Sequence, residues 1–147
     1  MRKAAKRIVF TNGCFDLLHV GHLRYLRQAR DEGDLLILGL NSDRSVRELK
    51  GINRPFVPQE ERAEILSALL MVDFIVIFDE RTPLELIKEI RPNVLVKGGD
   101  WKREDIVGGK EVEEDGGKVV VVPEISGRST SNLVARIIQK YRSEIEI

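Results

Sequence analysis

Residues 8–22, IVFTNGCFDLLHVGH, decide the fold of this chain and carry its strongest functional signal. The stretch begins as an apolar run, passes through the glycine turn Asn12-Gly13-Cys14, and ends in the step His19-Val20-Gly21-His22. This order predicts a buried strand, a tight turn and the start of a helix. The only two histidines of the 147 residues therefore cluster at one strand-to-helix junction.

A pair of imidazoles at a helix start favours chemistry on phosphate groups. The free backbone N–H groups and the macrodipole of a helix N-terminus already attract anions. Two histidines add directional donors that can follow charge among phosphate oxygens, which indicates phosphoryl or nucleotidyl transfer. Two alternatives are a zinc pair and two unrelated capping or surface histidines. Against zinc, Cys14 is the only thiol and no further ligands follow at zinc spacing.

Composition narrows the class of protein. At 147 residues the chain is expected to form one domain, residues 1–147. Lys plus Arg and Asp plus Glu both number 24, so no nucleic-acid or membrane partner is expected. The single cysteine allows no intrachain disulfide and favours a reducing, cytoplasmic location. The apolar run after the basic N-terminus, Ile8-Val9-Phe10, is too short for a signal peptide or a membrane span.

Apolar runs alternate with amphipathic segments along the whole chain. Strands are expected at 8–11, 35–40, 74–78, 94–97 and 119–122. Helices are expected at 22–32, at 42–49, from Pro58 onward, and from a capping box at 82–85 to about residue 91. A polar helix is expected between Trp101 and Gly116. The last helix is expected to begin at Ser129, with Leu133, Ile137 and Ile138 on its apolar face. Continuous apolar strands separated by helices predict an α/β fold: a Rossmann-like, doubly wound, five-stranded parallel sheet with helices on both faces.

Glycine-rich polar loops follow the first, fourth and fifth expected strands. In doubly wound sheets, ligands bind beyond the carboxyl ends of the strands, where strand order reverses. If the first and fourth strands are neighbours, the loop ending in His22 meets Gly98-Gly99-Asp100-Trp101 and the segment 127–131 in one pocket.

Each of these signals also has an ordinary structural interpretation. The glycine pair at 98–99 could form a simple turn, and Ser129 could only cap a helix. The basic side chains Lys50, Arg54 and Arg62 could be solvated surface charges. Cys14 is interpreted as a small packing residue rather than a nucleophile.

Two motifs resemble those of a known family. The run from Gly13 to His22 resembles the signature of the cytidylyltransferase-like nucleotidyltransferases, whose H-x-G-H motif binds a triphosphate. The segment Arg128-Ser129-Thr130-Ser131 resembles the second motif of the family, I-S-x-T, with arginine in place of isoleucine. Within the family, the chain is most similar to the adenylyltransferase domain of the bifunctional ADP-heptose synthases. Segments that match this domain in order are 49–51, 54–55, 61–62, 72–73, 82–83, 95–100 and 116–117.

The resemblance implies a reaction: transfer of AMP from ATP to the sugar phosphate D-glycero-β-D-manno-heptose 1-phosphate, which gives ADP-heptose and pyrophosphate. Mg²⁺ would be bound through the nucleotide phosphates, with no metal ligand from the protein, and the chain would form a homodimer. The expected catalytic residues are His19, His22 and Lys50. The expected nucleotide-binding residues are Asn12, Gly13, Cys14, Phe15, Gly21, Lys97, Gly98, Gly99, Asp100, Trp101, Ser129, Thr130 and Ser131, and the expected acceptor-binding residues are Arg54 and Arg62.

Other functions remain open at this point. Glycerol 3-phosphate or FMN could be the acceptor, as in other members of the family. Glycerol-3-phosphate cytidylyltransferase carries an arginine just before its second motif. The residue at that place in this chain is Glu124, which argues against cytidylyl transfer. A nucleotide-binding regulatory module without turnover is a further alternative. The bifunctional relatives carry a sugar kinase domain ahead of this one. Because only seven residues precede the first expected strand, the kinase activity is expected in a separate protein, which fits either a stand-alone adenylyltransferase or an excised domain.

Overall fold

A five-stranded parallel sheet forms the centre of the molecule, as the sequence predicts. The computed structural model describes residues 5–124 and 129–144. The sheet has the strand order β3-β2-β1-β4-β5, and every neighbouring pair is parallel. The strands are β1 (Ile8–Gly13), β2 (Leu35–Asn41), β3 (Phe74–Phe78), β4 (Val94–Gly98) and β5 (Lys118–Val122).

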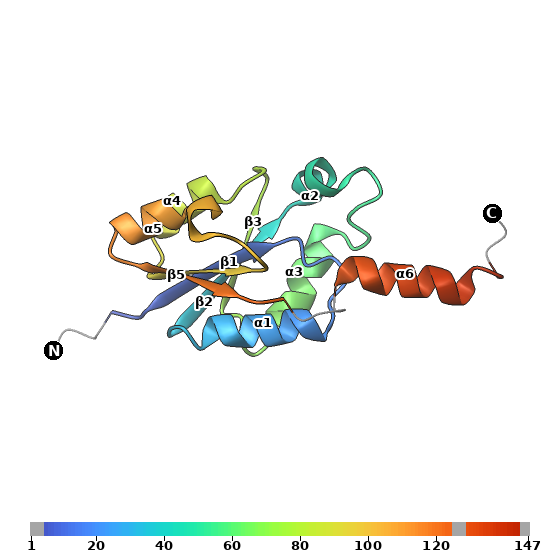
Figure 1. Ribbon diagram of the computed structural model, residues 1–147, viewed down its shortest axis with the longest axis horizontal. Helices are drawn as coiled ribbons and strands as arrows, with labels where there is room; N and C mark the ends of the chain where they lie inside the picture. Colours follow the sequence, from blue (N-terminus) through green and yellow to red (C-terminus); the bar gives the residue numbers. More distant parts are fainter. Residues whose placement is uncertain (1–4, 125–128, 145–147) are drawn as a thin grey trace.

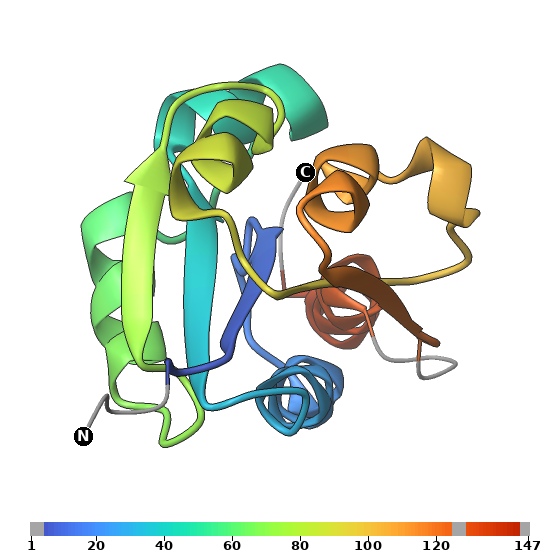
Figure 2. The ribbon, with the colours of Figure 1, turned by 90° about the vertical axis from the view of Figure 1, so that its left-hand side faces the viewer.

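Helices cover both faces of this sheet (Figures 1 and 2). They are α1 (Val20–Arg30), α2 (Asp43–Lys50), α3 (Gln59–Ser67), α4 (Leu84–Ile90), the 3₁₀ turn η1 (Arg103–Asp105), α5 (Gly109–Glu114) and α6 (Thr130–Tyr141). Alternate strand residues face opposite sides, so Val9 belongs to one core cluster and Phe10 to the other. The first cluster includes Leu26 of α1 and Leu66 of α3, and the second includes residues of α4 and α5.

The last helix, α6, stands apart from these layers. Figure 1 shows it projecting beyond the sheet. None of its described residues is buried, and Ile137 and Ile138 are 47% and 51% exposed. Its apolar face, which the sequence pattern predicts, is therefore not part of the core in this structure.

Two helix starts differ from the expectation. Helix α1 begins at Val20, two residues earlier than expected, because the His19 side chain caps it. Helix α4 has Pro83 at its cap position and no side-chain capping hydrogen bond, so the predicted capping box starting at Thr82 is wrong. Thr82 lies one residue ahead of the cap position, too far back to take that role.

The polar segment between β4 and β5 is also divided differently. The turn η1 and the helix α5 replace the single expected helix, and Gly108 lies between them with φ = 83°. An added Cβ at Gly108 would come within 2.5 Å of Ile87, so glycine is required there for both backbone and packing reasons.

The sheet order creates the site. Strand β1 lies between β2 and β4, so the order reverses beside β1. The carboxyl ends of β1 and β4 are thus adjacent, which is where doubly wound sheets bind ligands. In the part of the chain that the structure describes, no helix combines the length and the apolar character needed to cross a membrane.

Candidate active site

His19 and His22 form one interlocked unit at the start of α1. The Nδ1 atom of His19 accepts a hydrogen bond from the Gly21 amide at 3.1 Å. The Nδ1 atom of His22 accepts one from the His19 amide at 3.2 Å, which completes a reciprocal capping box. The two rings are in contact, with centroids 3.9 Å apart and planes tilted by 32°. Because Nδ1 acts as the acceptor in both rings, each neutral ring carries its proton on Nε2.

The environment keeps His22 neutral. Burial, followed by the nearby His19, lowers the pKa of His22 from 6.5 to about 4. At neutral pH the ring is therefore an uncharged Nε2–H donor with a fixed tautomer. Such a donor can hydrogen-bond a phosphate oxygen without giving up its proton, which suits stabilisation of charge that shifts during phosphate substitution.

Residues at the end of β1 and in the loop after it lie close to this pair. Phe15 is buried, with φ = 45°, and its ring centroid lies 5.4 Å from that of His22. A Cβ at Gly13 would come within 2.8 Å of the Phe15 ring, so glycine lets this ring lie against the strand end. Asn12 is half-buried near the end of β1, and Gly21 lies in the first turn of α1. Of these four expected site residues, Phe15 and Gly21 contact the histidine pair, and Asn12 and Gly13 lie at the end of β1.

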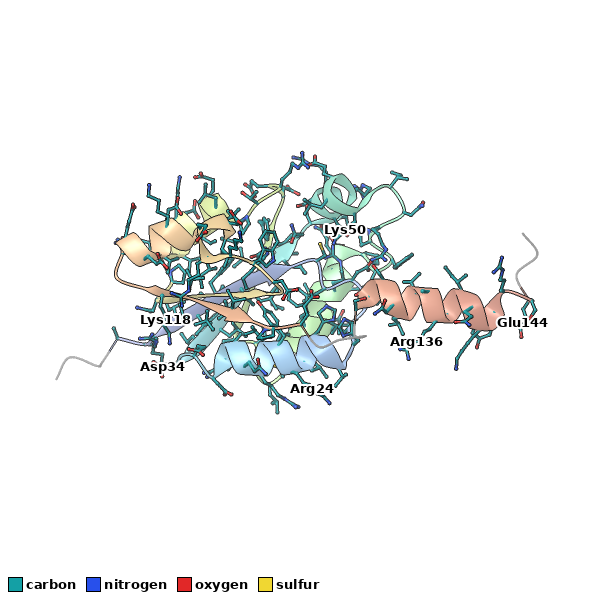
Figure 3. The ribbon with its side chains drawn as sticks, in the orientation of Figure 1. Arg24, Asp34, Lys50, Lys118, Arg136 and Glu144 are labelled. Carbon is teal, nitrogen blue, oxygen red and sulfur yellow. The ribbon has the colours of Figure 1, made fainter. Side chains whose placement is uncertain are left out.

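Positive charge gathers around Cys14. Burial raises the pKa of the Cys14 thiol, while Lys50, Arg62 and Lys97 oppose that rise. Burial is also the first cause of a lowered pKa at Lys97, and Lys50 contributes to it. Lys50 ends α2 (Figure 3), and Lys97 lies on β4, so two separate elements bring ammonium groups toward one place. Two nearby cations favour an anionic ligand, and a thiol with a raised pKa is a poor nucleophile.

The loop after β4 forms a second wall. Gly98 packs against Tyr25, because a Cβ there would lie 3.1 Å from its ring. Gly99 has φ = 107° and its Cβ position would lie 3.5 Å from the indole of Trp101. The Lys97 ammonium lies 5.2 Å from the centroid of the same indole. Asp100 is exposed beside it. A half-exposed indole with a cation on its face can pack against a planar, apolar ligand group.

The start of α6 lies against the loop that leads to His19. Ser129 is the N-cap, and its Oγ atom accepts from the Asn132 amide at 3.1 Å. The Thr130 hydroxyl donates to the Leu17 carbonyl at 3.0 Å, which ties α6 to the loop that leads to His19. Ser131 is exposed in the first turn. The capping interpretation of Ser129 is therefore correct in geometry. Arg128, which the resemblance also used, lies outside the described residues.

The two arginines expected to bind the acceptor are placed very differently. Arg54 is largely buried, lies 3.8 Å from the Asp16 carboxylate, and stacks 4.6 Å from the centroid of Phe56. Arg62 is only 1% exposed, and its guanidinium binds backbone carbonyls and Asp43. Its donors face the interior, so the expectation that Arg62 contacts the acceptor does not fit this geometry.

Two further residues matter that the site prediction did not include. Asp16 is buried and accepts hydrogen bonds from the amides of Phe56 and Val57. The Tyr25 hydroxyl lies within hydrogen-bonding distance of Thr11 and donates to the Val96 carbonyl at 3.1 Å, and burial raises the pKa of Tyr25 to about 12. Asp16 lies within the histidine motif, and Tyr25 follows His22 by one helical turn. These positions are the sequence signal by which both residues could be selected as candidate site residues.

Comparison with known proteins assigns the chain to a family. A family model described as cytidylyltransferase-like matches residues 10–142. The chain therefore belongs to the cytidylyltransferase-like family, and it is a nucleotidyltransferase. This outcome agrees with the motif resemblance and with a phosphate-directed site at the reversal of strand order.

Individual relatives refine this placement. "Bifunctional protein HldE" of Syntrophotalea carbinolica is 56% identical over 95% of this chain, and the protein of the same name from Geobacter sulfurreducens is 58% identical over 95%. The chain spans only 29% and 28% of the length of these two relatives.

Solved structures show the same fold. A structure described as the lipopolysaccharide core biosynthesis protein from Thermoplasma volcanium has a TM-score of 0.68 and 26% identity, over 82% of this chain and 98% of that one. Pantothenate synthetase from Thermus thermophilus has a TM-score of 0.62 and 16% identity over 94% of this chain and 64% of its own, which shows a shared fold alone.

Proposed function

We propose that this chain transfers AMP from ATP to D-glycero-β-D-manno-heptose 1-phosphate and releases pyrophosphate. The observation that carries the chemistry is the interlocked pair His19 and His22, whose Nδ1 atoms both accept backbone hydrogen bonds and leave the proton on Nε2. Lys50 and Lys97 act on Cys14, which lies five residues before His19. The acceptor is inferred from the motif order and from the high identity to proteins named HldE. We also propose that residues 1–147 act as one nucleotidyltransferase domain.

The mechanism follows from the charges in the site. The sugar phosphate oxygen attacks the α-phosphorus of ATP in line, the P–O bond to the β-phosphate breaks, and pyrophosphate leaves with the electron pair. His19 and His22 would donate hydrogen bonds to the crowded phosphorus centre, and Lys50 would neutralise the α-phosphate or the incoming phosphate. No covalent enzyme intermediate is needed, so positioning and charge stabilisation account for catalysis.

The N-terminus of α6 and the loop after β4 would hold the two ends of ATP. Ser129 and Thr130, at the N-terminus of α6, would bind the β- and γ-phosphates. Gly98, Gly99 and Trp101 would border the base and the ribose. Arg54, rather than Arg62, remains the basic residue proposed for the acceptor.

Magnesium is proposed as a companion of the nucleotide. In the described ranges, 5–124 and 129–144, no group of three or more His, Cys, Asp or Glu side chains is placed to hold a metal ion. The nearby donors are imidazole N–H and ammonium groups, which suit phosphate oxygens rather than a cation. This set fits Mg²⁺ carried on the triphosphate, where it would neutralise part of the phosphate charge.

The direct test is pyrophosphate release with ATP and heptose 1-phosphate. A parallel panel contains CTP with glycerol 3-phosphate, and ATP with FMN. Release only in the first reaction supports the proposal. Release only with one of the other pairs assigns a different acceptor within the family. ATP binding with no release on any acceptor would instead indicate a regulatory nucleotide-binding module.

We further propose that the protein acts in the cytoplasm as a homodimer, as the family resemblance implies. The chain mass is 16.7 kDa. Light scattering coupled to gel filtration should give about twice that mass at micromolar concentration. A mass equal to one chain across the concentration range would contradict the dimer.

A further inference from the structure

Arg62 lies at a crossing point of four chain segments. Its Nη1 atom donates to the Cys14 carbonyl at 2.7 Å and to the Asn41 carbonyl at 2.9 Å. Its Nε atom donates to the Val57 carbonyl at 2.8 Å, and its Nη2 atom meets the Asp43 carboxylate at 2.8 Å. One guanidinium thus joins the loop after β1, the end of β2, the first turn of α2 and the segment before α3.

Asp16 holds one of these segments from the other side. Its carboxylate accepts from the Phe56 amide at 2.9 Å and from the Val57 amide at 3.0 Å, and it lies 3.8 Å from the Arg54 guanidinium. Both side chains are almost entirely shielded from water, with 0% exposure for Arg62 and 4% for Asp16. Val57 is therefore held through its N–H by Asp16 and through its C=O by Arg62.

We propose that Asp16 and Arg62 form a brace that positions the reacting groups, and that Arg62 acts through it rather than by contact with substrate. The segments it joins lead directly to the proposed reactive side chains. Cys14 precedes the loop to His19, Asp43 begins the helix that ends at Lys50, and Val57 closes the segment that carries Arg54. A shift of one segment would change the distance between histidines and lysine, on which positioning catalysis depends.

Only arginine satisfies this arrangement. Its planar fork offers donors in three directions from one rigid group, whereas lysine presents its three donors from a single point. A lysine at position 62 would leave one or more of the carbonyls of Cys14, Asn41 and Val57 without a partner. The Arg62→Lys substitution therefore keeps the charge and removes the geometry, which makes it the informative variant.

The first experiment is amide hydrogen exchange on the 147-residue chain without substrate, comparing wild type with Arg62→Lys. We expect faster exchange in peptides covering residues 14–22 and 54–57, and unchanged exchange in β3. The matched control is Arg91→Lys, which alters the exposed Arg91–Asp115 pair and should leave these peptides unchanged. Because no substrate is present, this result is independent of the acceptor proposed above.

The second experiment separates positioning from substrate contact and rests on the proposed function. If the brace positions the site, Arg62→Lys should lower kcat by about 10- to 100-fold and change the acceptor KM by less than about threefold. An unchanged exchange pattern with a raised acceptor KM alone would overturn the proposal in favour of direct contact. Faster exchange with unchanged kcat would also overturn it, because the brace would then be structural only.

Asp43→Asn provides the variant for the case in which Arg62→Lys does not fold. It keeps the side-chain shape and removes the charge that holds one end of the guanidinium at 2.8 Å. We expect the same peptides to exchange faster and kcat to fall in the same direction, by a smaller factor. An Asp43→Asn protein with wild-type exchange and wild-type kcat would contradict the brace.

Discussion

Each histidine of the candidate active site places its two ring nitrogens in different surroundings. The Nδ1 atoms of His19 and His22 hold the first turn of α1 through backbone amides. The Nε2 atoms are the protonated positions, which suit phosphate oxygens. Because the structural contact fixes the tautomer, the proposed donor is in place before substrate binds, and no reorganisation would be needed during the reaction.

Replacing His22 with alanine should therefore separate folding from turnover. We expect the variant to fold but to lose about 10²–10³ in kcat, because a donor aimed at the transition state is removed. Circular dichroism and urea unfolding check the fold, and pyrophosphate release checks turnover. Near wild-type kcat in a folded variant would refute the catalytic role. His22→Gln, which retains a hydrogen-bonding group, serves as the companion variant.

The lowered pKa of His22 also predicts a pH dependence of stability. The ring titrates at about 4 in the folded protein and at 6.5 when unperturbed, so the unfolded chain binds more protons between these values. Stability should be complete above pH 6.5 and should fall as the pH drops toward 4. Allowing for the partial exposure of the ring, the loss is expected to be about 1–2 kcal/mol.

Urea unfolding of wild type and His22→Gln at about pH 7 and about pH 4.5, on either side of the ordinary imidazole pKa, measures this effect. The glutamine variant lacks the titrating ring, so its stability should fall less over the same interval. Equal pH dependence in the two proteins would show that His22 does not titrate abnormally. The comparison is a difference between variants, so other groups that titrate in this range cancel to first order.

At the scale of elements, α6 is joined to the site by its first turn. Ser129 caps the helix and Thr130 bonds the Leu17 carbonyl, while the rest of α6 buries no residue. The helix therefore presents its N-terminus to the histidine loop and its remaining length to solvent (Figure 1). This position suits binding of the leaving pyrophosphate, but it also suits a purely structural cap.

Calorimetric titration of Ser129→Ala and Thr130→Ala with ATP and AMP distinguishes these roles. Both roles predict a loss of stability on the order of 1 kcal/mol for Ser129→Ala. Only a β- and γ-phosphate site predicts weaker ATP binding with unchanged AMP binding, because AMP lacks those groups. Unchanged ATP affinity in both variants would make this segment structural. Thr130→Ser keeps the hydroxyl and should retain ATP affinity.

At the scale of the whole molecule, we expect nucleotide choice to depend on residues from separate parts of the chain. Lys97 and Trp101 come from the segment at the end of β4, and Glu124 follows β5, with its Oε1 atom 3.7 Å from the Cβ position of Gly99. By the motif resemblance, Glu124 corresponds to the arginine that glycerol-3-phosphate cytidylyltransferase carries before its second motif. We expect ATP to be preferred over CTP, measured as kcat/KM with a saturating acceptor. A ratio that favours CTP would support the glycerol phosphate alternative.

The order of residues was enough to predict the architecture, and it also indicates the centre of the candidate site. Apolar runs such as 35–40 and 94–97 are local signals, and they predict buried parallel strands because both faces of such strands are covered. The clustered histidines, the glycine turn and the Ser129 cap are likewise local, since each depends on residues within about one helical turn. These features can therefore be predicted from the order of residues alone.

The contacts between residues far apart in the sequence become apparent only in the folded protein. Arg62 and Cys14 are 48 residues apart, and Tyr25 and Val96 are 71 apart, so their contacts exist only after β1 has paired with β2 and β4. The sequence shows only that residue 62 is a basic arginine, and on that basis Arg62 is expected to bind the acceptor substrate. Burial then turned its donors toward backbone carbonyls, because a buried guanidinium must satisfy its hydrogen bonds within the protein.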